Sequence, residues 1–326
     1  MLFITASDIK NLFTMREAIE SDRQAFTVQA EGKTQIPVRT NFDVREGCVS
    51  SFMPGFVSAI PQVGIKVVST FYENIKKNLP VVSATVLLVD PETGLVSALL
   101  DGTEITRLRT GAVSGLATEL LAKENASLGA LFGTGGQALS QLEALLTVRN
   151  LSEVRVYDKF ENRIPDFIER AKPIAEKYHA RLVVAKSSDD AIDNADIITT
   201  VTTTTDPVFN GERVKQGAHI NGVGTFMPFK RELDEAIIAR ADLIFIDNMD
   251  AIMSEAGDLL IPMSQGKFKK EDITGELGDL ILGKIQGRTT STEITIMKTV
   301  GFATLDIVIA YNIYKKAIAK GVGVTI

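Results

Sequence analysis

Residues 128–146 read LGALFGTGGQALSQLEALL and decide the fold class of the chain. The apolar run before the glycines predicts a strand, and the run after them has the spacing of a helix. Gly133, Gly135 and Ala138 form the pattern G-x-G-x-x-A between the two. Here Gly133 permits a tight turn, Gly135 lets a pyrophosphate approach the backbone, and Ala138 allows close packing of helix on strand. The segment therefore predicts a dinucleotide-binding loop.

The acidic residue expected of such a unit follows at a suitable spacing. EVRVYD ends at Asp158, 25 residues after Gly133, and an acid at about this spacing binds the adenosine ribose. Asp158 would repel a 2′-phosphate, which favours NAD, whereas the neighbouring Lys159 keeps NADP possible. A later strand leads into VTT at 201–203, where ligands of parallel sheets bind. We expect the cofactor to be bound by Gly133, Gly135, Gly136, Gln137, Asp158, Lys159, Val201, Thr202 and Thr203.

Strands and helices alternate along the middle of the chain. This alternation predicts an α/β fold with a Rossmann-type, doubly wound parallel sheet. The expected strands are 128–133, 153–158, 180–185, 195–201, 218–224 and 241–248. Before them, the pattern indicates a helix over 7–31, a series of strands over 36–100 and a helix over 104–123. The stretch 298–320 reads as one long helix with a broad apolar stripe.

The composition excludes several classes of protein. The 326 residues carry 35 Lys and Arg against 41 Asp and Glu, and a net charge of −6 gives no electrostatic footprint for nucleic acid or anionic lipid. One cysteine and two histidines make a disulfide scaffold or a Cys- or His-ligated metal site unexpected. The N-terminus does not read as a signal peptide and no apolar run is long enough for a membrane span, so we expect a cytoplasmic protein.

Three basic residues interrupt apolar stretches of the first half. Arg39 lies in IPVR, Lys66 in VGIKVV and Arg109 in RLRTGAVS. A single basic residue in such a place is most often paired or has its charged end in solvent. Composition and spacing do not show whether the three converge.

The chain resembles the ornithine cyclodeaminase and mu-crystallin family over nearly its whole length. The resemblance is carried by PVR, GIKVV, LLDGTEITRLRTGAVSGLA, LFGTGGQA, INGVGTFMPFKREL and ITIMKTVGFATLDIVIAYNIYKKAIAKGVG, which occur in the family's order. It implies a Rossmann domain inserted into an α+β substrate-binding and dimerisation domain. The expected parts are 1–125 for the substrate-binding domain, 126–297 for the dinucleotide-binding domain and 298–326 for a helical segment that returns to the first.

The resemblance also implies roles for single residues. Arg39, Lys66 and Arg109 would bind the carboxylate of the substrate, a task for which a guanidinium fork is well suited, and Lys66 is the expected catalytic residue. Thr110 would face the cofactor, and Thr85 matches a position near the nicotinamide. The resemblance further implies a homodimer formed through the first domain.

One departure from the family bears on the reaction. Cyclodeaminases of this family carry a catalytic acid shortly after the strand INxVG, and here that position is Phe226. The nearest acid is Glu232, and Ser51 stands where ornithine-type enzymes have an acid before Met-Pro. Cyclodeamination needs a positioned base, which a phenyl ring cannot provide. Phe226 would instead shape an apolar substrate pocket.

The retained carboxylate-binding residues and the missing acid favour an NAD(P)H-dependent imine reductase. Its substrate would be a small cyclic 2-carboxy imine, such as pyrroline-2-carboxylate or piperideine-2-carboxylate, reduced to proline or pipecolate. Hydride transfer to such an imine needs mainly alignment and a held carboxylate. Three alternatives remain open: an alanine dehydrogenase-like enzyme, a cyclodeaminase with another acid, and a non-catalytic nucleotide-binding protein like mu-crystallin.

Overall fold

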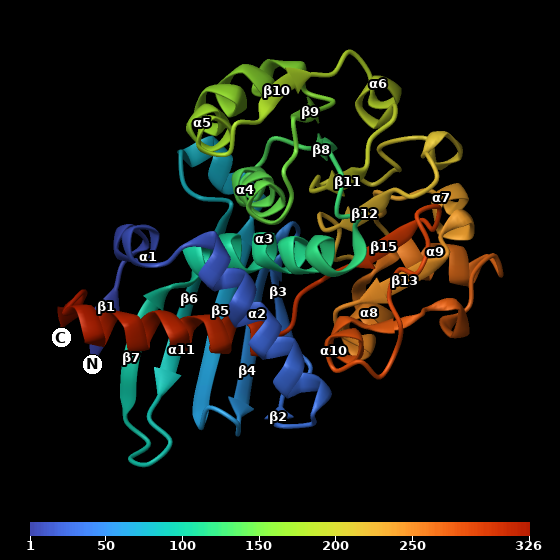
Figure 1. The fold of residues 1–326 in the computed structure, drawn as a ribbon. Coiled ribbons are helices and arrows are strands. Elements are labelled where there is room, and N and C mark those ends of the chain that lie inside the picture. The colour runs from blue at the N-terminus through green and yellow to red at the C-terminus, as the bar shows by residue number, and fades with distance from the viewer. The chain divides into compact units, whose positions relative to one another are not determined.

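The structure, a computed structural model, describes residues 1–326 apart from the side chain of residue 75, and it divides into two compact units (Figure 1). Unit 1 comprises Met1–Arg109 and Phe302–Ile326, and unit 2 comprises Thr110–Gly301. The first division falls inside helix α3 (Gly102–Leu121), whereas the pattern of the sequence changes after it, at residue 126. An α/β unit inserted into an α+β unit confirms the expected fold class.

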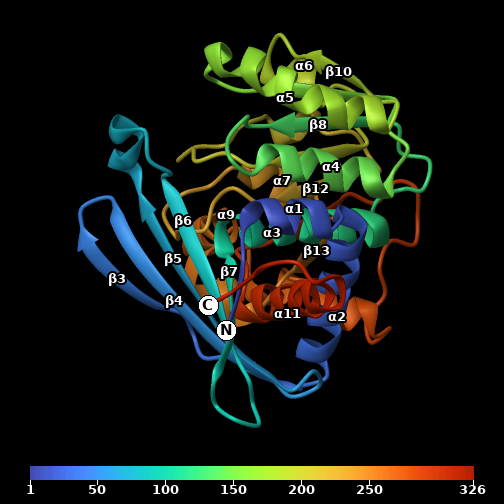
Figure 2. The ribbon, with the colours of Figure 1, turned by 90° about the vertical axis from the view of Figure 1, so that its left-hand side faces the viewer.

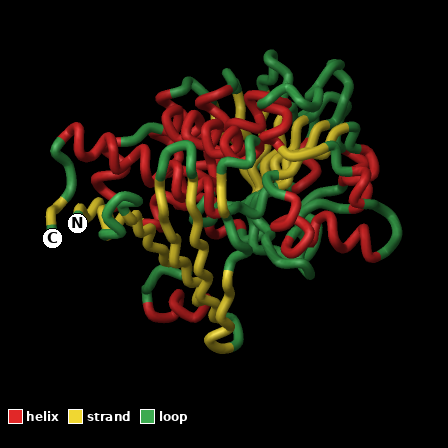
Figure 3. Tube along the Cα trace, turned by 90° about the horizontal axis from the view of Figure 1, so that it is seen from below, coloured by secondary structure: helices red, strands yellow, loops and turns green.

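Unit 1 is built on one mixed sheet. Its strands pair in the order β16-β1-β7-β6-β5-β4-β2, with β3 paired to β4. The strands are β1 (Leu2–Ile4), β2 (Thr34–Gln35), β3 (Thr40–Arg45), β4 (Cys48–Val57), β5 (Gln62–Phe71), β6 (Val82–Val89), β7 (Val96–Asp101) and β16 (Val324–Thr325). Because β1 and β16 are antiparallel neighbours, the two chain termini lie side by side (Figure 3). A 3-10 helix, η1 (Tyr72–Lys77), follows β5.

Helices cover one face of this sheet. They are α1 (Ala6–Leu12), α2 (Met15–Ala30) and α11 (Ala303–Lys320). The expected single helix over 7–31 is wrong, because Thr14 caps a new helix with a hydrogen bond from the backbone of Glu17. Helix α11 packs on α2 and on β4, β5 and β6 (Figure 2). The packing is tight: a Cβ on Gly64 would lie 3.1 Å from Ile307.

The opposite face of the sheet is also apolar. Side chains alternate between the faces of a strand, and the register joins Ile65 to Leu87 and Leu87 to Leu99. The residues of this outer face are half-buried: Phe52, Pro54, Phe56, Val63, Ile65, Val67, Leu87, Val89 and Leu99. We call this set the outer apolar face.

Unit 2 contains a parallel sheet, as the alternation of strands and helices predicts. The order is β10-β9-β8-β11-β12-β15-β13-β14. The strands are β8 (Leu128–Phe132), β9 (Glu153–Tyr157), β10 (Arg181–Val184), β11 (Ile197–Thr200), β12 (His219–Gly222), β13 (Leu243–Ile246), β14 (Gly275–Glu276) and β15 (Thr295–Lys298). All neighbouring pairs are parallel. The winding reverses between β8 and β11, which is where ligands of such sheets bind.

One strand of this sheet, β15, shows that the predicted start of the last helix is wrong. We expected a helix to begin at residue 298, but Thr295–Lys298 forms β15, inserted between β12 and β13. The long helix α11 begins only at Ala303. The short strand precedes a glycine-containing turn, and its apolar residues fit either type of element.

Helices connect the strands of unit 2. They are α4 (Ala138–Val148), α5 (Ile164–Lys177), α6 (Ser188–Ile192), α7 (Glu235–Arg240), α8 (Met249–Glu255), α9 (Gly257–Ser264) and α10 (Leu277–Ile281), with the short 3-10 helices η2 (Glu161–Arg163), η3 (Gly211–Arg213) and η4 (Lys270–Asp272). Buried apolar residues of the strands and helices form the core of the unit. Among the described residues of the whole chain, every helix is too short or too polar to cross a bilayer.

Candidate functional site

The loop after β8 has the features that a pyrophosphate needs. Gly133 has a φ of +98°, and a Cβ there would lie 2.8 Å from the carbonyl oxygen of Val201, so glycine is required. A Cβ on Gly135 or Gly136 would meet no protein atom within 4 Å, so the space beside this backbone is open. Helix α4 begins at Ala138, directly after the loop, so its N-terminal turn adjoins the loop; the N–H of Ala138 itself donates to the carbonyl oxygen of Gly135 at 3.1 Å.

A buried polar atom in the same loop lacks a partner. The side-chain oxygen of Gln137 is buried and accepts no hydrogen bond from the residues that the structure describes. A buried acceptor of this kind is costly unless a ligand or water donates to it. Together with the open space beside Gly135 and Gly136, this oxygen fits a bound dinucleotide. Gly135, Gly136 and Gln137 would therefore hold its pyrophosphate and the adjoining groups.

Asp158 directly follows β9 and is hydrogen-bonded to the phosphate loop. Its Oδ2 accepts hydrogen bonds from the backbone nitrogen of Thr134 at 2.9 Å and from its hydroxyl at 2.6 Å, while Oδ1 accepts from the nitrogen of Phe160 at 2.9 Å. One lone pair of Oδ1 remains for a ribose hydroxyl. Lys159 beside it is exposed. The structure thus places an acid and a base directly after β9.

The other residues expected to bind the cofactor lie in two places. Val201 and Thr202 directly follow β11, beside the turn at Gly133, and Thr203 after them is exposed. Thr110 is buried, and its carbonyl oxygen accepts a 3.0 Å hydrogen bond from Gln141 of α4. Thr110 therefore packs beside the helix that begins at the phosphate loop.

In unit 1 the basic residues meet at a buried acid. Lys66 points to the sheet face that α11 covers, and its Nζ lies 2.5 Å from Oδ2 of Asp306 on that helix. The Nε of Arg109 lies 3.2 Å from the other oxygen, Oδ1. Arg39 is close enough to act on the charges of both Lys66 and Asp306. The structure therefore brings together the three basic residues that the resemblance singled out, and we call them with Asp306 the basic cluster.

Burial gives the cluster an unusual protonation balance. It lowers the pKa of Lys66 to about 7, an effect that Asp306 opposes and that Arg109 and Arg39 strengthen. Burial alone would raise the pKa of Asp306, but the charges of Lys66 and Arg109 outweigh it and hold that pKa below its usual range. Near neutral pH the cluster thus holds an ionised Asp306, two guanidinium groups and a lysine close to its titration midpoint. The excess of positive charge suits a bound carboxylate.

Two acids of this region are absent from our sequence interpretation. Asp306 is one, and Asp22 of α2 is the other. Both are fully buried, and neither oxygen of Asp22 has a hydrogen-bond partner among the described residues. Burial, with the nearby charge of Asp306, raises the pKa of Asp22 well above its usual value, although Arg109 opposes this. In the sequence, Asp22 and Asp306 are each a single acid within an otherwise apolar helix face. This pattern could have identified both as buried acids.

Thr85 does not join the basic cluster. It pairs with Val67 in the register of β5 and β6, one residue out of step with Lys66 and Val86. Because faces alternate along a strand, Thr85 lies on the outer face of the sheet and is exposed, whereas Lys66 lies on the helix-covered face. Any contribution of Thr85 to cofactor binding must come from that other face.

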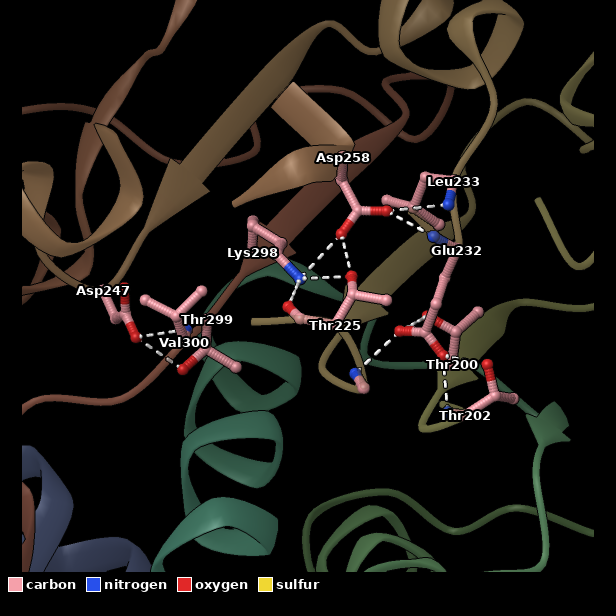
Figure 4. A network of polar contacts seen from close by, with 11 residues as sticks. Thr200, Thr202, Thr225, Glu232, Leu233, Asp247, Asp258, Lys298, Thr299 and Val300 are labelled. Carbon is pink, nitrogen blue, oxygen red and sulfur yellow. Dashed lines mark hydrogen bonds and ion pairs between the residues drawn. The ribbon is translucent and has the colours of Figure 1, made fainter. Parts of the chain in front are cut away.

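The acids that follow Phe226 are fully engaged (Figure 4). Phe226 itself is 42% exposed. Glu232 is fully buried and accepts four hydrogen bonds, from the backbone and hydroxyl of Thr202, the hydroxyl of Thr200 and the backbone of Gly224. Asp258 is also fully buried and lies 2.7 Å from Nζ of Lys298. Neither carboxylate has a free lone pair directed to a substrate.

The chain matches the family model "Ornithine cyclodeaminase/mu-crystallin family" over residues 1–321. A Delta(1)-pyrroline-2-carboxylate reductase of Bacillus cereus is 37% identical to it over 324 residues, which cover 99% of this chain and 98% of that protein. The structure of Thermococcus litoralis Delta(1)-pyrroline-2-carboxylate reductase in complex with NADH and L-proline superposes with a TM-score of 0.95 at 36% identity, covering 100% of both chains.

An archaeal alanine dehydrogenase dimer with bound NAD is similar as well. Its TM-score is 0.92 at 33% identity, covering 100% of this chain and 98% of that one. Full-length matches to a family model and to relatives above 30% identity identify the family and confirm the resemblance that the sequence motifs carry. The chain belongs to the ornithine cyclodeaminase/mu-crystallin family.

Proposed function

We propose that this protein is an NADH-dependent reductase of small cyclic 2-carboxy imines, with Δ1-pyrroline-2-carboxylate as the preferred substrate and proline as the product. The observation that carries the proposal is the basic cluster, in which Lys66 and Arg109 flank a single buried carboxylate and leave an excess of positive charge. The similarity to two reductases of this substrate supports it.

The substrate carboxylate binds to Arg39, Lys66 and Arg109. Asp306 keeps two of these side chains in place, so that they are oriented before the substrate arrives. Reduction adds a hydride to the carbon of the C=N bond and a proton to its nitrogen. NADH supplies the hydride when it is bound to unit 2. Lys66, which titrates near neutral pH, is the group of the cluster suited to deliver the proton.

Reduction is preferred to cyclodeamination because no carboxylate stands at the position of the cyclodeaminase acid. Phe226 occupies the position of the cyclodeaminase acid, and the two carboxylates that follow it, Glu232 and Asp258, are buried and saturated with hydrogen bonds. Phe226 is proposed to form an apolar wall of the substrate site. Ser51, at the other position where ornithine-type enzymes have an acid, donates a hydrogen bond to Asn41.

Alanine dehydrogenase activity is the second candidate, because an enzyme of that name is 32% identical to this chain over 322 residues. Both reactions use a carboxylate and a C=N carbon. They differ in the source of the nitrogen, since reductive amination must take up ammonia, whereas a cyclic imine already contains its nitrogen.

A kinetic panel distinguishes the candidates. Oxidation of NADH and of NADPH is followed with Δ1-pyrroline-2-carboxylate, piperideine-2-carboxylate, and pyruvate with ammonia, and ammonia release is followed with ornithine. We expect the highest kcat/KM with Δ1-pyrroline-2-carboxylate and NADH. Faster turnover of pyruvate would favour the dehydrogenase, and ammonia release from ornithine would favour a cyclodeaminase. Tight nucleotide binding without turnover of any substrate would favour a non-catalytic binding protein.

The structure of unit 1 and the relatives also support a proposal on the oligomeric state of the protein. The outer apolar face of unit 1 suits an interface with a second copy of the chain, and a relative in the family forms a dimer. We therefore propose a homodimer formed through this face. NADP as an alternative cofactor and a location in the cytoplasm stay predictions.

A further inference from the structure

Glu232 accepts hydrogen bonds from the carboxyl ends of two neighbouring strands of unit 2, β11 and β12 (Figure 4). One oxygen accepts hydrogen bonds from the backbone nitrogen of Thr202 at 2.5 Å and from its hydroxyl at 2.8 Å. The other accepts from the hydroxyl of Thr200 at 3.0 Å and from the backbone nitrogen of Gly224 at 2.7 Å. Thr200 ends β11, and Gly224 follows β12. A single side chain thus bridges the ends of two neighbouring strands.

A second carboxylate fixes the position of the first. Asp258 accepts hydrogen bonds from the backbone nitrogen of Glu232 at 2.6 Å and from that of Leu233 at 2.9 Å. Its other oxygen contacts the hydroxyl of Thr225 at 2.6 Å and Nζ of Lys298 at 2.7 Å. Lys298 is the last residue of β15, the strand beside β12. The hydrogen-bond network of Glu232 and Asp258 therefore extends to the end of a third strand.

The loops joined in this way touch each other and the phosphate loop. A Cβ on Gly224 would lie 2.2 Å from the carbonyl oxygen of Thr202, and one on Gly133 would lie 2.8 Å from that of Val201. The loop after β11 is therefore held between the loop after β12 and the phosphate loop. Because the contacts are close, a shift of Thr202 away from Glu232 must also move the backbone on which the turn at Gly133 rests.

We propose that Glu232 is a positioning residue for the nucleotide, which holds the loop after β11 against the phosphate loop. Glu232 is fully buried and acts through Thr202 and Gly224 rather than by contact with a ligand. The inference rests on the proposed binding of NADH to unit 2. It also accounts for a buried acid that the proposed reaction does not use.

The substitution E232Q tests the hydrogen bonds of Glu232 with little change in the shape of the side chain. An amide can accept hydrogen bonds through one oxygen only, and its NH₂ group would face an N–H donor of Thr202 or Gly224. We expect E232Q to raise the Kd of NADH, measured by fluorescence titration, by about tenfold, the effect of losing roughly one hydrogen bond to a charged group. Thr200→Val removes one hydroxyl donor to Glu232 and provides a milder second variant, with an expected rise of about threefold.

Asp196→Asn is the matched control. Asp196 is a largely buried carboxylate of the same unit that accepts hydrogen bonds from the backbone of Ser127 and Leu128 at 2.9 and 3.1 Å. It also pairs with Lys215 at 2.7 Å. It lies at the amino end of the strands, where β8 begins, so its loss lowers stability without reaching the nucleotide. We expect the Kd of NADH to stay within about twofold of the wild type.

The outcomes separate this inference from the proposed function. A wild-type protein that binds no NADH overturns both. If the wild type binds NADH while E232Q and Thr200→Val bind it equally well, the inference is wrong and the proposed function stands. An equal rise of Kd in Asp196→Asn and E232Q, in step with their losses of Tm, also overturns it. A rise confined to the Glu232 and Thr200 variants supports it.

Discussion

Nζ of Lys66 and Oδ2 of Asp306 lie 2.5 Å apart inside unit 1, although 240 residues separate them in the chain. Asp306 also holds Arg109 through its second oxygen, so one carboxylate orients two cations. A buried ion pair contributes little net stability when compared with apolar packing, but losing one partner leaves an uncompensated charge. The arrangement is therefore better explained by preorganised binding of an anion than by stability.

Lys66→Met removes one cation from the basic cluster. We expect the KM for Δ1-pyrroline-2-carboxylate to rise by about 10- to 100-fold, the effect of losing a hydrogen bond between charged groups. The Kd of NADH should change little, because the nucleotide is assigned to unit 2. Steady-state kinetics and fluorescence titration measure the two quantities. Lys33→Met is the control, since Lys33 is an exposed lysine of the same unit whose side chain is 52% accessible.

An equal loss of NADH affinity in Lys66→Met would contradict the assignment of this residue to the substrate carboxylate. A normal KM would contradict it as well. An unchanged Lys33→Met protein shows that removing a lysine from unit 1 is not in itself harmful.

The activity should fall as the pH rises through about 7. Burial lowers the pKa of Lys66 to about 7, so the side chain is charged below this pH and neutral above it. Substrate binding and proton delivery need the charged form, and kcat/KM reports the free enzyme. Asp306→Asn removes the carboxylate that opposes the shift, so the fall should begin at a lower pH. The profile of kcat/KM against pH measures the position of this fall. Identical profiles in the wild type and in Asp306→Asn would contradict the assignment of the fall to Lys66.

Asp22→Asn should stabilise the protein. In the folded state burial raises the pKa of Asp22 well above 3.8, whereas in the unfolded chain the group ionises near that value. The unfolded state therefore releases a proton that the folded state keeps, and the resulting penalty grows as the pH rises above about 4. We expect the variant to gain roughly 1–3 kcal/mol at neutral pH, and less near pH 4. Urea unfolding at both pH values measures it.

Asp166→Asn is the control for this prediction, because Asp166 is an acid whose side chain is 76% accessible. It should leave the free energy of unfolding nearly unchanged at both pH values. A gain that is the same at pH 4 and pH 7 would show that ionisation of Asp22 is not its source.

Local sequence patterns predicted six of the eight strands that the structure describes in unit 2. The run from Leu128 to Val148 contains a complete strand, turn and helix, and its glycines are needed for reasons that act within a few residues. The strand β15 could not be predicted in the same way. Only two of its four residues are apolar, which is too short a pattern to distinguish a strand from a helix. Its place between β12 and β13 depends on pairing with residues far away in the chain.

The residues of the candidate site also differ in whether local sequence patterns could predict them. The phosphate loop and Asp158 follow from spacing along the chain. The basic cluster does not, because Lys66, Arg109 and Asp306 come from β5, α3 and α11, and only the family resemblance linked the first two. The role of Glu232 also needs the fold, since its four donors lie at the ends of two different strands.

Leu87→Asp should convert the proposed dimer to monomers. Leu87 lies at the centre of the outer apolar face, paired with Ile65 and Leu99 on the neighbouring strands. A carboxylate there would lose its hydration in the interface without gaining a partner, a large cost for a buried charge. Sedimentation velocity should show two chains in the wild type and one in the variant. Glu92→Lys, an exposed change at the tip of the β6–β7 hairpin, should leave the dimer intact, and a monomeric wild type would refute the interface.

Asp158→Asn should weaken the preference for NADH over NADPH. The carboxylate of Asp158 offers one remaining lone pair to a ribose hydroxyl and would repel the 2′-phosphate of NADPH, with exposed Lys159 beside it. Asparagine removes the repulsion and leaves the lysine free to attract the phosphate. We expect the ratio of kcat/KM for NADH to that for NADPH to fall by about tenfold, mainly through KM. Asp193→Asn, which changes an exposed acid of the same unit, should leave the ratio unchanged. A ratio that stays the same in Asp158→Asn would mean that discrimination between the two cofactors lies elsewhere in the nucleotide site.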